Sequence, residues 1–548
     1  MNSKAFFKRH FWLIIAVFAA LIYSYPFFLA AFRHSYVTGD DIQTHMQRVE
    51  GMLSSYKAGH VPARLHLSTL GNFAYGMGFF YPQLLLVIPL VFRLLGMNFI
   101  LSTNSFLVLV NILTVLSVYF CIYKITGSSL SAFSAAVISL ISHYRLADIF
   151  YRGSLGETTA FIFTPLLVLG LYELFHRRQS GTLWAVTGLA GILYSHLLSF
   201  VFTATLLLLF LVFTLPFWAK DSRIRTQLFI FIALSLLVTA GFWMPFLEQY
   251  INVDLLVKSG YDSPYRPAVS AAAVLKIISY WWRTMPSSLY DPLCLTIPVI
   301  LLTFVTGKRK NTAVITGLTL TGLLGCFLSS NLFPWEKFET LHHFIQFPWR
   351  FMFLPASALP LAFGLALGSI EHRKLQTLLS LLPVSVCVFI TVPILGNVIN
   401  NYIFPSPGYR AIQDGVGAGE YLPVGASVEE IQKQGRNILF PGDNFSFEYT
   451  EKGTKAQLRY QTGKEITIEL PFLYYKGWMY QYGGEKPVPA EHGPHGLVTV
   501  KLPPNDAGIL NVFYQKTFFQ WAADLFTCMG LAGLILLNKK VRNMRSAG

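Results

Sequence analysis

FWLIIAVFAALIYSYPFFLAAF, residues Phe11–Phe32, is a continuous apolar stretch near the start of the chain. It exceeds the roughly 20 apolar residues that cross the core of a bilayer as a helix. A basic start precedes it, as in a signal peptide, but the stretch is too long for the apolar part of such a peptide and lacks a clear small-residue cleavage site. We therefore expect a first membrane helix that is retained.

The composition of the whole chain extends this interpretation. Hydrophobic residues make up 53% of it and charged residues only 13%, whereas soluble domains contain roughly 25% charged residues. Further apolar runs such as Leu183–Trp218 are continuous rather than alternating, which favours helices over the strands of a membrane barrel. The chain is therefore predicted to be a polytopic α-helical membrane protein.

The formal net charge of +15 does not indicate a nucleic-acid partner. Lys and Arg form short clusters between the apolar runs instead of one basic stripe, as positive-inside loops do. The five cysteines lie in or at the ends of apolar runs, with neither a zinc-ligand spacing nor a disulfide framework. We expect them to be packing residues.

Placing the basic clusters in the cytoplasm predicts about 12 or 13 membrane helices, with both termini cytoplasmic. Leu84–Leu95 is expected to be an interfacial or re-entrant helix, because a full crossing would turn every later basic cluster outward. The expected outer loops are 33–99, 147–157, 248–290 and 329–350. The expected spans are 11–32, 100–123, 129–146, 158–175, 183–199, 200–218, 226–247, 291–306, 311–328, 351–370, 375–395 and 517–537.

The expected spans and the composition divide the chain into three regions. Residues 1–395 form the predicted transmembrane domain, and residues 517–548 form a last helix with a basic cytoplasmic tail. Residues 396–516 are polar, contain many Gly and Pro, and include short β-type runs between turn signals. We expect them to form a small extracytoplasmic β-sandwich.

Three polar clusters fall on the outer side of this predicted topology. The first contains Asp40, Asp41, His45 and Arg48. On a helix, Asp41 and His45 lie one turn apart on the same face. Such carboxylates can hold a divalent cation, Mg²⁺ or Mn²⁺, or can take a proton from an acceptor hydroxyl. The alternative is that one of them only caps a surface helix.

The second and third clusters supply further charged and polar groups. Arg152 and Glu157 flank a Gly-Ser-Leu-Gly turn, where Glu157 could complete a metal or base site and Arg152 could bind a phosphate. The alternative is a local ion pair between these two residues. His196 lies in an outward hairpin, and a lone His there is as often a packing residue as a ligand.

Other cations lie in the later outer loops. Arg350, in Phe347–Phe351, is placed at the outer end of a span, which suits the phosphate of a lipid-linked substrate, although Trp and Arg are also ordinary interfacial anchors. Arg266 and Arg283 are further phosphate candidates.

The order GDDIQTHMQRVEGM, AGHVPAR, GFFYPQ, YRGSLGE, YSHLLS and IQFPWRF resembles that of bacterial membrane proteins labelled pyruvoyl-tetrahydropterin-synthase-related. Those proteins are in turn similar to the GT-C superfamily of glycosyltransferases. The resemblance covers roughly residues 10–400, and ELPFLYYKGWMYQYGG also resembles the outer domain of the related YfhO-type proteins.

The resemblance implies a GT-C-like fold, a place in a bacterial plasma membrane and a polyprenyl-phosphate-linked sugar as donor. Asp41 matches the acid of the first outer loop, with Asp40 beside it, and Glu157 matches that of the second. Asp-Asp replaces a separated Asp-x-Asp, which leaves the use of a metal by Asp40, Asp41 and Glu157 open.

The expected reaction is an inverting sugar transfer to an extracytoplasmic glycan or lipid acceptor. Asp41 would act as the base, while Arg152, Arg350 and His196 would stabilise the leaving phosphate, with His45 and Arg48 nearby. Two other classes remain open, a transporter of lipid-linked sugars and a catalytically silent scaffold for envelope assembly.

Overall fold

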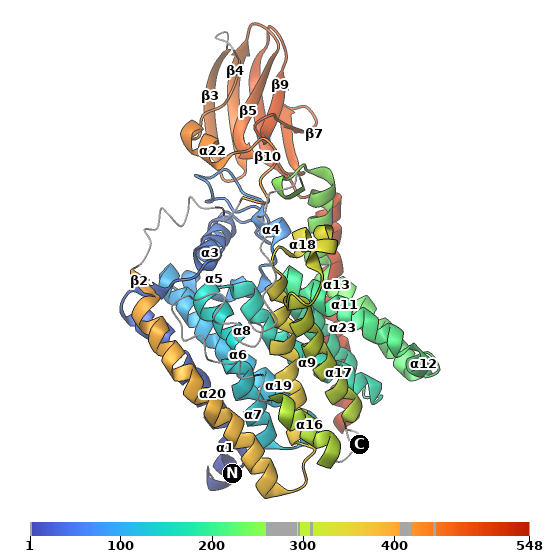
Figure 1. Ribbon diagram of the computed structural model, residues 1–548. Helices are drawn as coiled ribbons and strands as arrows, with labels where there is room; N and C mark the ends of the chain where they lie inside the picture. The colour runs from blue at the N-terminus through green and yellow to red at the C-terminus, as the bar shows by residue number, and fades with distance from the viewer. Residues whose placement is uncertain are drawn as a thin grey trace.

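The computed structural model describes residues 3–258, 293, 296–306, 311–405, 416, 419–441 and 445–546. Its two parts are a long helical bundle and a β-rich domain that stands on one end of the bundle (Figure 1). Both chain termini lie at the opposite end. The expected combination of a mostly helical membrane part and a β-domain near the C-terminus is confirmed.

The first half of the bundle is an almost continuous series of helices. Asn98 caps α6 by accepting a hydrogen bond from Leu101 N at 2.8 Å, and Gly127 ends the same helix with a φ of 75°, as expected for these cap residues. The helices up to residue 258 are α1 (Ser3–Tyr23), α2 (Tyr25–Phe32), α3 (Ile42–Lys57), α4 (Met77–Phe80), η1 (Leu84–Leu86), α5 (Val87–Leu94), α6 (Phe99–Thr126), α7 (Ser129–Ile141), α8 (His143–Leu146), η2 (Ala147–Arg152), α9 (Leu155–Phe175), α10 (Ser180–Ser195), α11 (Leu197–Phe213), α12 (Leu215–Trp218), α13 (Ser222–Asn252) and η3 (Leu256–Lys258).

The second half completes the bundle and adds strand β2 and the β-domain, beside which α22 lies (Figure 1). Its helices are α16 (Thr296–Thr306), α17 (Thr312–Ser329), η5 (Trp335–Lys337), α18 (Glu339–Ile345), η6 (Pro348–Met352), α19 (Phe353–Leu367), α20 (Arg373–Asn401), α22 (Val428–Gln434) and α23 (Phe518–Ser546). The strands are β1 (Ser35–Val37), β2 (Ile403–Pro405), β3 (Phe445–Lys452), β4 (Lys455–Thr462), β5 (Ile466–Leu473), β6 (Trp478–Tyr482), β7 (Val488–Pro489), β8 (Glu491–His492), β9 (Leu497–Leu502) and β10 (Ala507–Tyr514).

Seven helices of the described part are long and apolar enough to cross a membrane, or nine if each of two bent pairs is one span. These numbers are below the 12 or 13 spans expected from the sequence. Helices occupy the other expected spans, but α10, α11 and α16 have only 16, 17 and 11 described residues. The stretch Leu84–Leu94 is likewise a short apolar helix, and at 1.5 Å per residue it is shorter than a bilayer core of about 30 Å.

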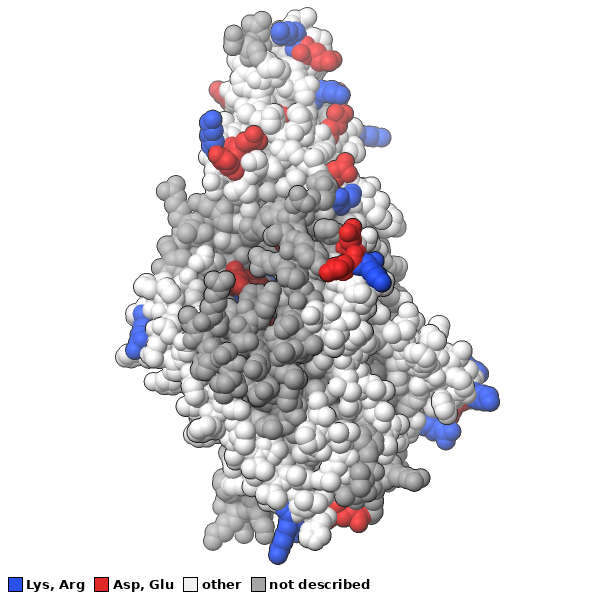
Figure 2. Space-filling view, viewed as in Figure 1, with Lys and Arg blue, Asp and Glu red and all other residues white. Residues whose placement is uncertain are grey.

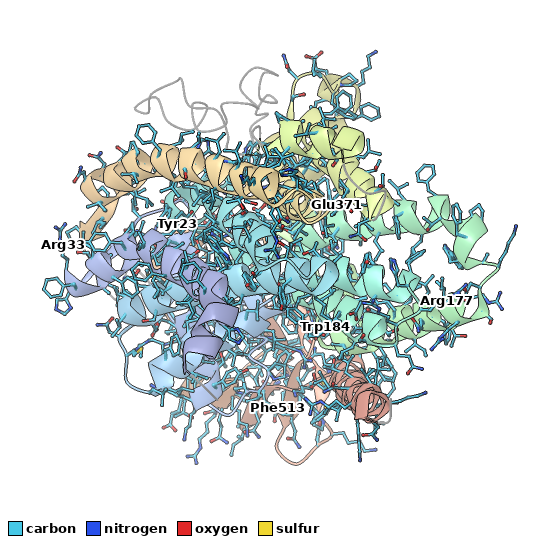
Figure 3. All side chains as sticks on the ribbon, turned by 90° about the horizontal axis from the view of Figure 1, so that it is seen from below. Tyr23, Arg33, Arg177, Trp184, Glu371 and Phe513 are labelled. Atoms are coloured by element: carbon cyan, nitrogen blue, oxygen red, sulfur yellow. The ribbon has the colours of Figure 1, made fainter. Side chains whose placement is uncertain are left out.

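Charged side chains are distributed unevenly over the surface. On the face shown in Figure 2, they gather on the β-domain and near the ends of the helical part, and the described surface between is mostly uncharged. Seen from below, Arg177 lies at the edge of the bundle, while Tyr23 lies within it (Figure 3). Arg177 forms an ion pair with Asp221 at 2.7 Å, where α9–α10 and α12–α13 turn at the end remote from the β-domain.

The β-domain consists of two antiparallel sheets with the strand orders β3-β4-β10-β6-β7 and β5-β9-β8. Residues on β4 alternate between exposed and buried, which is typical of a strand with one face on a core. Side chains from both sheets, including Leu458, Leu470, Val500 and Leu510, belong to one buried apolar cluster.

Several contacts join the β-domain to the bundle. Leu473 N on β5 donates to Phe73 O in the first outer loop at 2.9 Å, and Gln249 at the end of α13 donates to Lys476 O at 2.8 Å. In addition, β1 pairs with β2, so the chain leaving α2 is joined to the chain leaving α20. The first outer loop is therefore tied to segments from the far end of the sequence.

Candidate active site

The first two polar clusters meet through their backbones. Asp41 N donates to Arg152 O at 2.7 Å, and Asp40 N donates to Tyr151 O at 3.3 Å. A Cβ on Gly39 would lie 2.6 Å from the carbonyl carbon of Arg152, which is closer than real Cβ atoms approach. Glycine at this position thus permits the contact that the outer-side placement of both clusters predicted.

We expect Gly39→Ala to separate these segments, because a methyl group has no room there. Overpacking of this kind costs about 1–3 kcal/mol, and we expect a fall in Tm together with at least tenfold slower turnover. Gly463→Ala is the matched control, since nothing lies within 4 Å of its Cβ position. Equal Tm values for the two variants in detergent would contradict the close approach.

A broken membrane helix presents the second cluster. The α7 helix ends at Ile141, and the chain continues through α8 and the π-helix η2, with a bend of 49° between the two parts of the span. Gly153 has a φ of 63°, and α9 begins two residues later. The wide π turn and the left-handed glycine bring residues of one short segment toward a common interior.

Arg152 lies at the centre of a buried network of carboxylates. Its Nη1 donates to Asp148 Oδ1 at 2.5 Å and to Glu157 Oε2 at 2.7 Å, and its Nη2 is 3.4 Å from Asp41 Oδ2. Tyr144 donates its hydroxyl to Glu157 Oε1 at 2.6 Å. Both oxygens of Glu157 are therefore occupied, and its side chain is only 1% exposed.

This network changes the role expected for Arg152. A phosphate ligand needs donors that face the substrate, whereas the guanidinium of Arg152 contacts three carboxylates and lies 4.7 Å from the Trp349 ring centroid. The ion pair between Arg152 and Glu157, which was the alternative to a phosphate-binding role, is present. Arg152 thus joins the clusters and positions Asp41.

Asp41 is the accessible carboxylate of this network. Its side chain is 45% exposed, and its contact with Arg152 is long. It occupies the N-cap position of α3, but its side chain makes no capping hydrogen bond, so capping does not account for it. Asp40 is exposed, and its charge acts on Tyr402, next to β2.

His45 and Arg48 form a buried group one turn further along α3. Arg48 Nη1 donates to His45 Nδ1 at 3.0 Å, and its guanidinium lies 3.9 Å from the Tyr81 ring centroid. Because an arginine only donates, Nδ1 of His45 must accept, which leaves the proton of the neutral ring on Nε2. Burial and the charge of Arg48 lower the pKa of His45 well below its usual value, so the ring stays neutral.

His66 is a second buried histidine outside the spans. It is 1% exposed, its Nε2 lies 2.9 Å from Gln83 Oε1, and burial lowers its pKa to about 4. Between pH 6.5 and 4, the unfolded chain therefore binds a proton that the folded chain excludes. Stability should fall as the pH decreases through this window, by about 1.4 kcal/mol per pH unit for each such histidine.

We expect Tm to be lower at pH 5 than at pH 7.5, and His66→Gln should reduce this difference. Gln keeps a polar side chain at the site but has no proton to bind. His372→Gln, at the opposite end of the bundle, is the control. Thermal unfolding in detergent at both pH values measures the effect, and an unchanged pH dependence in His66→Gln would contradict it.

His196 joins the site from the turn between α10 and α11. Its Nδ1 accepts from Ser199 N at 3.3 Å, which again leaves the proton of the neutral ring on Nε2. Its ring centroid lies 6.2 Å from that of Tyr81, and it interacts electrostatically with Glu157 and Arg350. The three predicted clusters therefore meet.

Arg350 completes the group of cations. Its Nη1 donates to Ile345 O and Gln346 Oε1, both at 3.0 Å, and no hydrogen-bond partner of its buried Nε lies among the described residues. Its charge acts on Asp41 and Glu157. Arg266 and Arg283 lie outside the described residues.

The predicted metal ligands Asp40, Asp41 and Glu157 do not fit a divalent cation in this arrangement. The guanidinium of Arg152 lies between Asp41 and Glu157, and the oxygens of Glu157 already accept two hydrogen bonds. Among the described residues, no group of three His, Cys, Asp or Glu side chains is arranged to hold a metal.

Sequence reasoning missed four members of the site. Asp148 lies four residues before Arg152 in a mostly apolar run, and this charge spacing was the available signal. Tyr81 lies in the GFFYPQ motif, but no chemical role was predicted for it, and Tyr144 carried no signal. Glu420 lies on the segment that leads to the β-domain, and burial together with the charge of Asp41 raises its pKa.

Comparisons with known proteins are sparse. No protein-family model matches the chain. An uncharacterized protein of Lactococcus lactis subsp. cremoris (strain MG1363) is 23% identical over 247 residues, which cover 43% of this chain and 39% of that protein. The chain thus spans about two fifths of the length of this curated relative.

The fold also has a distant likeness to solved structures. Crystal structures of ArnT from Cupriavidus metallidurans, bound to undecaprenyl phosphate and in the apo state, align over 70% and 71% of this chain and 65% and 66% of theirs. The TM-score is 0.43 for both, with 12% and 13% sequence identity.

Proposed function

We propose that this protein is a membrane glycosyltransferase that transfers a sugar from a polyprenyl-phosphate-linked donor to an acceptor hydroxyl. One observation carries the proposal: an exposed carboxylate, Asp41, lies beside buried arginines and two neutral histidines at the β-domain end of a membrane bundle. A base and convergent phosphate-binding donors are what this reaction requires.

In the proposed reaction, Asp41 accepts the proton of the acceptor hydroxyl. The acceptor oxygen attacks the anomeric carbon, and the bond from this carbon to the phosphate oxygen breaks with inversion. The phosphate leaves with its negative charge, which Arg350 and the Nε2–H groups of His45 and His196 stabilise. Arg152 holds Asp41 in position, and no step requires a metal.

The proposed orientation follows from the positive-inside rule. The basic residues Arg177, Arg223 and Arg373 lie at helix ends remote from the β-domain. Placing them in the cytoplasm puts the site and the β-domain outside a bacterial plasma membrane, with both termini inside. The acceptor is then an extracytoplasmic glycan or lipid.

The test uses purified protein in lipid nanodiscs with a panel of radiolabelled polyprenyl-phosphate sugars, including undecaprenyl-phosphate donors. We expect sugar transfer or donor hydrolysis that persists when EDTA is added. Full loss of turnover with EDTA would overturn the metal-independent mechanism. Binding of the lipid-linked sugar without turnover for any donor would instead indicate the transporter or scaffold class.

A further inference from the structure

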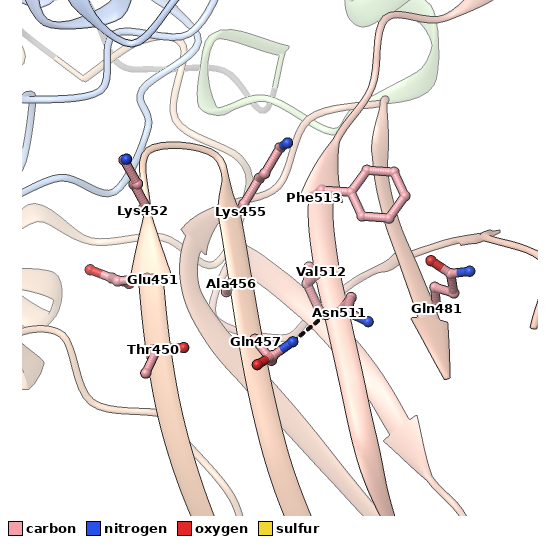
Figure 4. A pocket seen from close by; sticks show the side chains of 10 residues that line it. All are labelled: Thr450, Glu451, Lys452, Lys455, Ala456, Gln457, Gln481, Asn511, Val512 and Phe513. Atoms are coloured by element: carbon pink, nitrogen blue, oxygen red, sulfur yellow. Dashed lines mark hydrogen bonds between the residues drawn. The ribbon is translucent and has the colours of Figure 1, made fainter. Parts of the chain in front are cut away.

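The exposed face of the five-stranded sheet carries an ordered row of polar side chains. In the strand register, Thr450 lies opposite Gln457, Gln457 opposite Asn511, and Asn511 opposite Gln481. The row therefore runs straight across β3, β4, β10 and β6. These residues line a groove of about 550 Å³ on the β-domain, and Figure 4 shows it.

The amides in this row are held in fixed directions. Gln457 Nε2 donates to Asn511 Oδ1 at 2.9 Å, and Gln481 Nε2 donates to Glu485 O at 2.5 Å. Gln457 Oε1, Gln481 Oε1 and the Asn511 amide remain as acceptors and donors for a ligand. Asn is a poor strand former, yet Asn511 lies on the central strand of the sheet. Alternating donors and acceptors of this kind suit vicinal hydroxyls.

A second row lies two residues along the strands, about 7 Å away. In this row, Lys452 lies opposite Lys455, and Lys455 opposite Phe513. Both lysines are exposed, and both project from the same end of the hairpin in Figure 4. Like charges directly opposite each other destabilise a strand pair. An anionic ligand would relieve this repulsion.

We propose that this groove binds an acidic polysaccharide of the uronic-acid class. The amide row bonds the ring hydroxyls, the lysine pair binds a carboxylate, and Phe513 offers an apolar surface to a sugar face. The polymer is the acceptor of the sugar transfer, and this assignment rests on the proposed function.

The hairpin at one end of the groove also contacts the part of the chain that carries the site. The hairpin between the two lysines contacts the end of α3, where Thr454 Oγ1 lies 3.0 Å from His60 Nε2. Asp41 is at the other end of α3, about 24 Å away for a helix of 16 residues. A polymer of several sugars is long enough to span this distance.

The experiment measures binding of a hexamer of galacturonic acid to full-length protein in uncharged phosphatidylcholine nanodiscs, by calorimetry and without donor. We expect the hexamer to bind, and the double variant Lys452→Gln/Lys455→Gln and the variant Asn511→Ala each to bind at least tenfold more weakly. Lys464→Gln, an exposed lysine outside the groove, should bind like the wild type. A dextran hexamer should bind more weakly than the uronate.

Equal affinity of the groove variants and the wild type would overturn the proposal, and so would the absence of uronate binding. Preference for poly(glycerol phosphate) over uronate would overturn the assigned class. Because binding is measured without donor, an inactive transferase leaves this result unchanged. A separate activity assay tests the role of the polymer as acceptor. In this assay, the groove variants should keep donor hydrolysis and lose sugar transfer to the polymer.

Discussion

Asp41→Asn is expected to reduce sugar transfer by about 10²–10⁴-fold, the contribution that a positioned general base makes. Asn has nearly the same shape and can still accept a hydrogen bond from Arg152, but it cannot take the proton of the acceptor hydroxyl. Donor binding should therefore persist while transfer is lost.

Asp40→Asn is the comparison for this experiment. Asp40 is a neighbouring carboxylate, but it is exposed, and its charge acts on Tyr402. We expect less than a tenfold loss. Transfer by labelled donor and donor binding by filtration should be measured for both variants, and full activity of Asp41→Asn would refute the assigned base.

The second large effect is expected at Arg152. Replacement by Gln leaves Asp148 and Glu157 buried without their cation, and breaking a buried pair from one side costs about 3–5 kcal/mol. We expect a fall in Tm far larger than for Arg177→Gln. Arg177 forms an exposed pair with Asp221, and such a pair contributes little to stability because solvent screens it.

A triple variant separates the structural effect from the chemical one. Adding Asp148→Asn and Glu157→Gln to Arg152→Gln removes the unpaired charges, so most of the lost Tm should return. Turnover should stay low, because Asp41 has lost its positioning partner. A triple variant as unstable as Arg152→Gln would show that the buried charges do not cause the effect.

The sequence predicted that the three polar clusters lie close together in the fold. That prediction came from the side of the membrane expected for each loop, which was inferred from the number of crossings and the basic loops. Asp41, Arg152 and Glu157 meet as expected, with His196 and Arg350 acting on the same carboxylates. The roles of these residues were less predictable, since Arg152 binds carboxylates.

Tertiary packing decides the features that the sequence did not reveal. The run from Ser129 to Arg152 was expected to contain one ordinary span, yet it bends by 49° and ends in a π-helix. No periodicity marks such a break. Glu420 lies in a segment without a regular pattern, and backbone contacts with η3, which follows α13, fix its place, including Val257 N to Glu420 O at 2.9 Å.

The pairing of β1 with β2 bears on how this protein could change during evolution. One strand directly precedes Asp40, and the other leads toward the β-domain. A recombination event that exchanged the chain from a point before β2 onward would replace β2, which ends at Pro405. Ser35–Val37 would then lose the strand with which it pairs. We therefore expect the β-domain to be inherited together with the first outer loop, and chimaeras between relatives to succeed only when both segments come from the same parent.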